Sequence, residues 1–140
     1  MKHLLLALFL IPLIGVAQDS LSTELDTVEN QDLIFDFPEE MPEFPGGEQA
    51  MYKFIIANME YPTMAKEAGI QGKVYIQFVI DTTGEVTDIQ VIRGVKQEGG
   101  NALDREAIRV IRIMPKWKPG SINGKPVRVR FTLPINFSLH

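Results

Sequence analysis

The chain contains no cysteine among its 140 residues, so disulfides, thiol catalysis and thiolate metal sites are excluded. Histidine occurs only as His3 and His140, so the body of the chain lacks the usual proton shuttle and metal ligand. The four serines therefore have no internal histidine to activate them. The sequence predicts a protein that is not an enzyme, with no catalytic residues, no metal and no cofactor.

The sequence also lacks an apolar run of the length typical of a membrane-spanning helix. The longest, Leu4–Ala17, has 14 residues, which form about 21 Å of helix against about 30 Å of hydrocarbon. Lys2 precedes this run, and small residues close it at Ala17, as in a secretory signal peptide. We therefore expect residues 1–17 to be a signal peptide that directs secretion, with an uncleaved membrane anchor as the alternative.

Basic residues are absent from Gln18–Glu48, which contains ten acidic residues, whereas Gln49–His140 has a net charge of about +5. The acidic stretch also has three prolines and ends in a double glycine. This composition predicts a flexible acidic arm over residues 18–47, followed by one domain over residues 48–140. A secreted chain with a net charge of −4 is not expected to bind nucleic acid.

Hydrophobic periodicity predicts the elements of the domain. Two short helices precede a β-hairpin whose turn contains Gly84, and a β-bulge near Thr87 or Asp88 keeps its second strand in phase. The strongest amphipathic pattern covers residues 102–114, and a strand follows it. We expect an α+β fold with two layers: a three-stranded antiparallel sheet covered by helix 102–114, with one or two short N-terminal helices.

The closing strand carries an unusual residue. Every odd-numbered residue from Val127 to Leu139 is apolar, which predicts one buried face. Pro134 lies within this alternation, and proline is confined to edge strands, strand starts or bulges because it has no N–H to donate. The pattern therefore predicts an edge strand beside which another chain could lie.

Several motifs together resemble the C-terminal domain of the TonB family over residues 49–140. The chain also has "FPGG" at Phe44–Gly47, similar to a lead-in found in one branch of that family. The landmarks of the resemblance are Tyr61-Pro62, Ala65, Gly69 to Gly72, Asp81, Gly84, Leu103-Asp104, Trp117, Pro119-Gly120 and the closing strand.

The resemblance implies a periplasmic domain that binds TonB-dependent outer-membrane receptors and takes part in energy-coupled transport. In this family a receptor peptide, the TonB box, adds to the edge of the last strand, and inner-membrane motor proteins supply work from the proton gradient. The resemblance implies two sets of contacts on this chain. The strand edge would be Arg128, Val129, Arg130, Phe131, Thr132 and Leu133, and a further receptor contact would be Asn58, Tyr61 and Pro62.

Three features of the sequence leave alternatives open. The apolar run and the arm are both shorter than in a full transducer, so the chain could instead be a freestanding periplasmic adaptor or competitor that transduces no energy. The arm segment "ELDTVEN" at residues 24–30 faintly resembles a TonB box, which suggests self-regulation. An exposed last strand could also pair with a second copy to give a homodimer.

Overall fold

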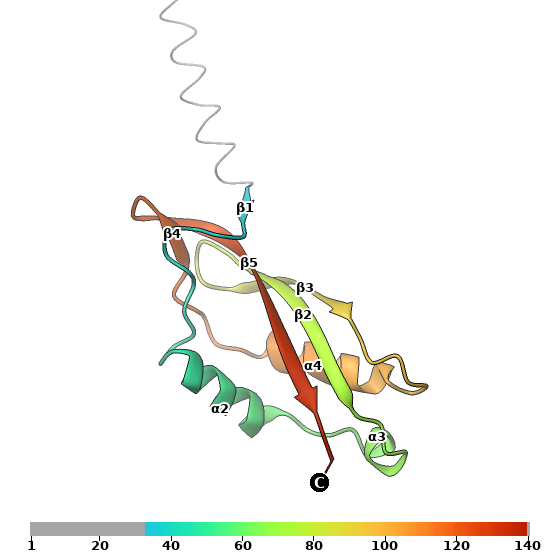
Figure 1. Cartoon of the computed structure of the whole chain (residues 1–140). Coiled ribbons are helices and arrows are strands. Elements are labelled where there is room, and N and C mark those ends of the chain that lie inside the picture. Colours follow the sequence, from blue (N-terminus) through green and yellow to red (C-terminus); the bar gives the residue numbers. More distant parts are fainter. Residues whose placement is uncertain (1–32, 140) are drawn as a thin grey trace, which may run out of the picture. The chain divides into compact units, whose positions relative to one another are not determined.

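The computed structural model describes residues 33–139, and from Ile34 onward these form one compact unit (Figure 1). The expected signal peptide and the box-like stretch 24–30 lie outside the described residues. Within residues 33–139, no helix has the length and apolar character needed to cross a membrane. The elements are β1 (Ile34–Phe35), α2 (Glu48–Asn58), α3 (Thr63–Glu67), β2 (Gly72–Ile80), β3 (Val86–Arg93), α4 (Asn101–Arg112), β4 (Gly120–Ile122) and β5 (Lys125–Phe137).

The sheet has the strand order β1-β5-β2-β3, and β2 pairs antiparallel with both β3 and β5. The predicted three-stranded antiparallel sheet is thus confirmed as its centre. Two short strands add to it on β5: β1 pairs in parallel, and β4 pairs antiparallel with residues 125–127. Both were missed by the sequence prediction, because strands of two and three residues are too short to show alternation.

The predicted β-bulge is present in β3. Gln77 pairs with Gln90 and Val79 pairs with Thr87, so β3 carries one more residue than β2 between these pairs. Asp88 lies in this gap with a φ of 50°. A left-handed residue of this kind bends a strand locally, and aspartate tolerates it better than most residues.

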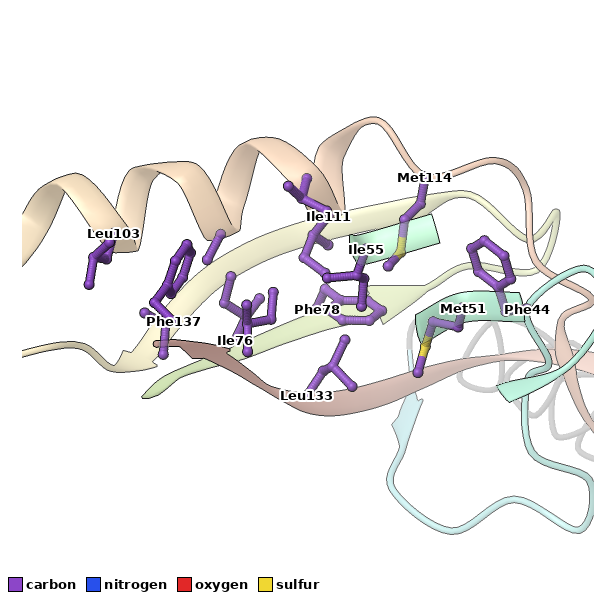
Figure 2. Packing of buried hydrophobic residues seen from close by; sticks show 14 of the residues in the cluster. Phe44, Met51, Ile55, Ile76, Phe78, Leu103, Ile111, Met114, Leu133 and Phe137 are labelled. Carbon is purple, nitrogen blue, oxygen red and sulfur yellow. The ribbon is translucent and has the colours of Figure 1, made fainter. Parts of the chain in front are cut away.

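The core lies between the sheet and the helices on one face of it. Figure 2 shows Leu103 and Ile111 of α4 directed towards the strands, where they meet Ile76 and Phe78 of β2. All four side chains are completely inaccessible to solvent. The two layers therefore form as the amphipathic pattern predicts, and the odd-numbered residues of β5 supply the remaining wall, such as Phe137.

The described part of the acidic arm follows the domain surface, which differs from the flexible arm expected from composition. Backbone hydrogen bonds join Glu40 to Ser121 and Glu43 to Lys118, with N···O distances of 2.8–3.0 Å. The next residue, Phe44, is only 6% exposed and belongs to the core cluster. Its ring lies with its centroid 5.6 Å from that of Trp117, so the arm ends in a hydrophobic anchor.

The β2–β3 turn is organised by the carboxylate of Asp81. Its Oδ1 accepts hydrogen bonds from the Thr83 hydroxyl and from the N–H groups of Thr83 and Glu85, at 2.7–2.9 Å. Burial alone raises the pKa of Asp81, but these hydrogen bonds outweigh it and hold the pKa below its usual value. The ionised carboxylate therefore stabilises the turn.

We expect Asp81→Asn to lower the free energy of unfolding at pH 7 by about 1 kcal/mol. Because the folded pKa is lowered, the contribution of Asp81 is complete above the unfolded pKa, about 3.9, and is lost as pH falls through the folded pKa. Urea unfolding of both proteins between pH 2 and 7 measures this. The difference between them should narrow below pH 4, and a constant difference would contradict the role assigned to the charge.

Candidate functional site

The hydrogen-bonding direction of β5 follows from its proline. Pro134 lies opposite Tyr75 within an uninterrupted antiparallel register. Since proline has no N–H, this must be a non-hydrogen-bonded pair, in which backbone groups point away from the partner strand. Such pairs alternate along a ladder, so the other even-numbered residues also point away from β2. The outer edge of β5 thus presents the backbone N–H groups of Arg130, Thr132 and Asn136.

Only part of this edge is open. The sequence predicted a free edge over Arg128–Leu133, but β1 pairs with its first two residues, Ile34 opposite Arg128 and Phe35 opposite Val129. Within the described part of the chain, no strand pairs with the outer side of β5 beyond Val129. The first two residues of the predicted site are therefore covered by this chain, and the binding role of the whole set stays a prediction.

Both arginines of the predicted site contact carboxylates of this chain. An Nη2 atom of Arg128 lies 3.3 Å from Asp88 Oδ2 at the β3 bulge, and Nη1 of Arg130 lies 3.1 Å from Asp36 Oδ1 just after β1. All four side chains are partly exposed, and such pairs typically contribute at most about 1 kcal/mol. An acidic peptide would therefore have to compete with weakly held internal carboxylates.

An apolar groove of about 370 Å³ adjoins the open edge, between α2 and β5. The rings of Trp117 and Phe131 within it are 5.3 Å apart and nearly edge to face. Thr132 and Pro134 of the open edge also contribute to the lining. The other apolar side chains of the groove are Pro42, Phe44, Met51, Tyr52, Trp117, Phe131 and Leu133, and two acidic residues, Glu43 and Glu48, also line it.

Sequence reasoning missed this groove because its residues come from the arm, α2, the segment before β4 and β5. No local pattern joins these four segments. Trp117, a landmark of the family resemblance, is only 4% exposed. The groove therefore offers apolar surface next to unpaired backbone, the combination that an added strand with alternating side chains requires.

The second predicted contact, around Tyr61, lies elsewhere. The Tyr61 hydroxyl donates a hydrogen bond to the carbonyl of Ile70, and its ring packs against Phe137 with centroids 5.7 Å apart. Burial raises the pKa of Tyr61, which keeps this hydroxyl protonated. Phe137 is six residues beyond Phe131, roughly 20 Å along the strand, so the two predicted contacts do not form one compact site.

The two other members of that set are also tied to the fold. The Asn58 side chain donates to the Phe54 carbonyl at 2.8 Å, and the backbone carbonyl of Asn58 accepts a hydrogen bond from the guanidinium of Arg109 in α4 at 2.6 Å. Pro62 directly precedes α3. These contacts give Asn58, Tyr61 and Pro62 structural roles, and receptor contact at these residues stays a prediction.

A charged cluster joins this segment to α4. Glu106 accepts hydrogen bonds from the Glu60 N–H and from Arg109, each at 2.6–2.7 Å. Burial raises the pKa of Glu106, but the hydrogen bonds and the positive charge of Arg109 outweigh this and lower it overall. The ionised carboxylate therefore fixes the chain before Tyr61, and no three metal-ligating side chains gather within residues 33–139.

The family model of the C-terminal part of the Gram-negative bacterial TonB protein matches residues 57–139, more than half of the chain. The chain belongs to the TonB C-terminal family. The resemblance inferred from the sequence motifs is thus confirmed. TonB of Xanthomonas campestris is 35% identical over 83 residues, which cover 58% of this chain and 34% of that protein. TonB of Vibrio cholerae is 33% identical over 81 residues, 56% of this chain and 31% of that protein.

This TonB-family chain therefore matches only about a third of the length of these curated relatives. Among solved structures, the Helicobacter pylori TonB C-terminal domain has a TM-score of 0.48 and 27% identity, covering 66% of this chain and 79% of that one. The Pseudomonas aeruginosa TonB C-terminal domain has a TM-score of 0.46 and 31% identity, covering 58% and 78%.

The TonB family match covers the open edge of β5 but leaves out β1 and part of the groove beside that edge. The match begins at residue 57, so it includes β5 and Trp117 and excludes β1 and nearly all of α2. Six of the eleven residues that line the groove therefore lie outside the family match: Pro42, Glu43, Phe44, Glu48, Met51 and Tyr52.

Proposed function

We propose that this chain is a periplasmic TonB-like protein that binds TonB-dependent outer-membrane receptors by strand addition and takes part in energy-coupled transport. The observation that carries the proposal is the open part of the β5 edge. From Thr132 to Phe137 its outward backbone groups have no strand partner within the described residues. Main-chain hydrogen bonds at such an edge provide affinity for an extended peptide.

The groove supports the same function and adds selectivity. A peptide that pairs with Thr132 would place alternate side chains on the helix side of the sheet, where Phe131 and Leu133 line the groove. Those side chains could bury apolar surface against Trp117. We therefore infer that the preferred receptor peptides carry apolar residues at alternate positions opposite Phe131 and Leu133.

A nuclear magnetic resonance titration of the ¹⁵N-labelled chain tests the proposal. The probes are synthetic peptides covering the N-terminal segments of the TonB-dependent receptors encoded by the same genome, with a scrambled peptide of equal composition as the control. We expect saturable shifts at the amides of residues 130–133 and 135–137 and at the indole of Trp117 with some of these peptides and none with the scrambled one. Shifts confined to the surroundings of Tyr61, or no shifts, would contradict the proposal.

The location and the wider assembly follow from this proposal. Receptor N-terminal segments are reached from the periplasm, so the edge of β5 would act there. Coupling to inner-membrane motor proteins would then pass through the part of the chain N-terminal to the compact unit, which begins at Ile34.

A further inference from the structure

The arm places a strand of its own on the candidate binding edge. Ile34 and Phe35 pair in parallel with Arg128 and Val129, the first two residues of the predicted receptor site. Asp36 follows directly, and its carboxylate lies 3.1 Å from Arg130. The segment thus offers an extended backbone, two apolar side chains and one acidic side chain to β5.

The contact between this segment and β5 is small. It comprises a strand of two residues and one ion pair whose side chains are 38% and 51% exposed. Phe37, the next apolar residue, is 94% exposed and adds nothing to the contact. A solvent-exposed ion pair and a ladder of two residues bind the β1 segment only weakly to β5.

The segment nevertheless stays near the edge because it is tethered. The backbone bridges at Glu40 and Glu43 and the buried ring of Phe44 hold the chain within ten residues of β1. A short tether of this kind gives an effective concentration on the order of millimolar. Weak pairing is then enough to keep the edge occupied, yet a longer peptide strand could displace it.

The open part of the edge provides the place where displacement begins. Thr132 and Asn136 present free N–H groups beyond the part of β5 that β1 covers. An incoming strand can pair there first and then extend towards Val129, removing β1 one residue at a time. In the final state the short β1–β5 ladder is replaced by a longer ladder between the peptide and β5. The ion pair of Arg130 with Asp36 is replaced by one with an acidic residue of the peptide.

We propose that Ile34–Asp36 is an internal competitor for the β5 edge, which incoming peptides displace when they run parallel to β5 with an apolar pair followed by an acidic residue. This inference rests on the proposed function for its physiological partner. It concerns a segment different from the box-like stretch 24–30, and one that lies outside the family match.

A reversible crosslink tests the proposal in the full chain. Ile34→Cys with Arg128→Cys places two thiols at directly paired residues, about 5 Å apart at Cα, within the range that a disulfide spans. The native chain has no other cysteine to interfere. The probe is a fluorescent peptide with the sequence of residues 31–40, "QDLIFDFPEE", titrated against the oxidised protein and against the same protein after reduction.

We expect the oxidised protein to bind this peptide at least tenfold more weakly than the reduced protein. The single variants Ile34→Cys and Arg128→Cys should show no dependence on reductant, which controls for the substitutions themselves. Equal affinities in the oxidised and reduced double variant, or no binding by either, would overturn the proposal.

A charge variant in the arm provides a second test that leaves β5 unchanged. Asp36→Arg should raise the affinity for the same peptide severalfold, because it repels Arg130 and releases β1. Glu39→Arg makes the same change of charge at an exposed residue beyond β1 and should have no effect. Equal effects of the two variants would show that only overall charge matters and would count against the proposal.

Receptor peptides added to the same crosslink assay separate this inference from the proposed function. If they bind the oxidised and reduced proteins equally, the competitor role fails while receptor binding stands. If they bind neither form while the arm peptide still distinguishes the two, receptor binding fails while the internal competitor stands.

Discussion

Thr132→Pro should abolish peptide binding and leave the protein folded. The N–H of Thr132 points away from β2, so its loss removes no hydrogen bond from the central ladder. Phe131 is already extended, as the residue before a proline prefers, and the native Pro134 occupies an equivalent outward-facing position. We expect a loss of stability of about 1 kcal/mol or less, measured by urea unfolding, and no saturable binding of receptor peptides in the titration.

Phe131→Pro is the matched variant one residue earlier, and we expect it to unfold the domain. Phe131 lies in a hydrogen-bonded pair with Phe78 of β2, so proline here removes a central bond worth about 1 kcal/mol. It also removes a partly buried ring that packs against Trp117 and Phe78, which adds to the loss. If Thr132→Pro bound peptides like the native protein, or if both variants unfolded alike, the assignment of inward and outward positions would be wrong.

Gly84→Ala should destabilise the protein by at least about 3 kcal/mol. Gly84 has a φ of +91°, and a Cβ added there would lie 1.9 Å from the carbonyl oxygen of Trp117. The two residues are already joined, since the Trp117 N–H donates to the Gly84 carbonyl at 2.8 Å. The clash is with backbone, so either the turn or the Trp117 segment must move. Urea unfolding and the fluorescence of Trp117, the only tryptophan, measure both effects.

Gly69→Ala is the control for the cost of a positive φ alone. Gly69 has a φ of +69°, but nothing lies within 4 Å of an added Cβ. We expect this variant to lose only about 1 kcal/mol and to leave the Trp117 emission unchanged. Equal losses in the two variants would show that the turn and the Trp117 segment separate freely, and that the groove does not depend on their contact.

The central elements were predictable because their patterns are local and long. The helix predicted over residues 102–114 is observed at Asn101–Arg112, and its apolar stripe covers the sheet as expected. The alternation in β2 and β5 and the turn at Gly84 likewise appear where the sequence placed them. In each case one short-range periodicity determines both the element and the face that it buries.

The surroundings of the edge could not be predicted, because they depend on contacts between distant residues. Asp36 and Arg130 are 94 residues apart, and β1 is too short to show any alternation. The composition around Phe44, rich in acidic residues and prolines, predicts disorder. Composition does not reveal that the ring of Phe44 is buried in the core. The sequence therefore predicted an edge but not which part of it is covered.

Pro134 also limits how copies of this protein can assemble. The open edge presents N–H donors at Thr132 and Asn136, with a gap at Pro134. A second copy that aligned its own edge here would meet an interrupted ladder, and its own proline would interrupt the ladder again. Continuous edge-to-edge stacking into fibrils is therefore disfavoured, whereas a short peptide beside Thr132 needs only the part of the ladder before the gap.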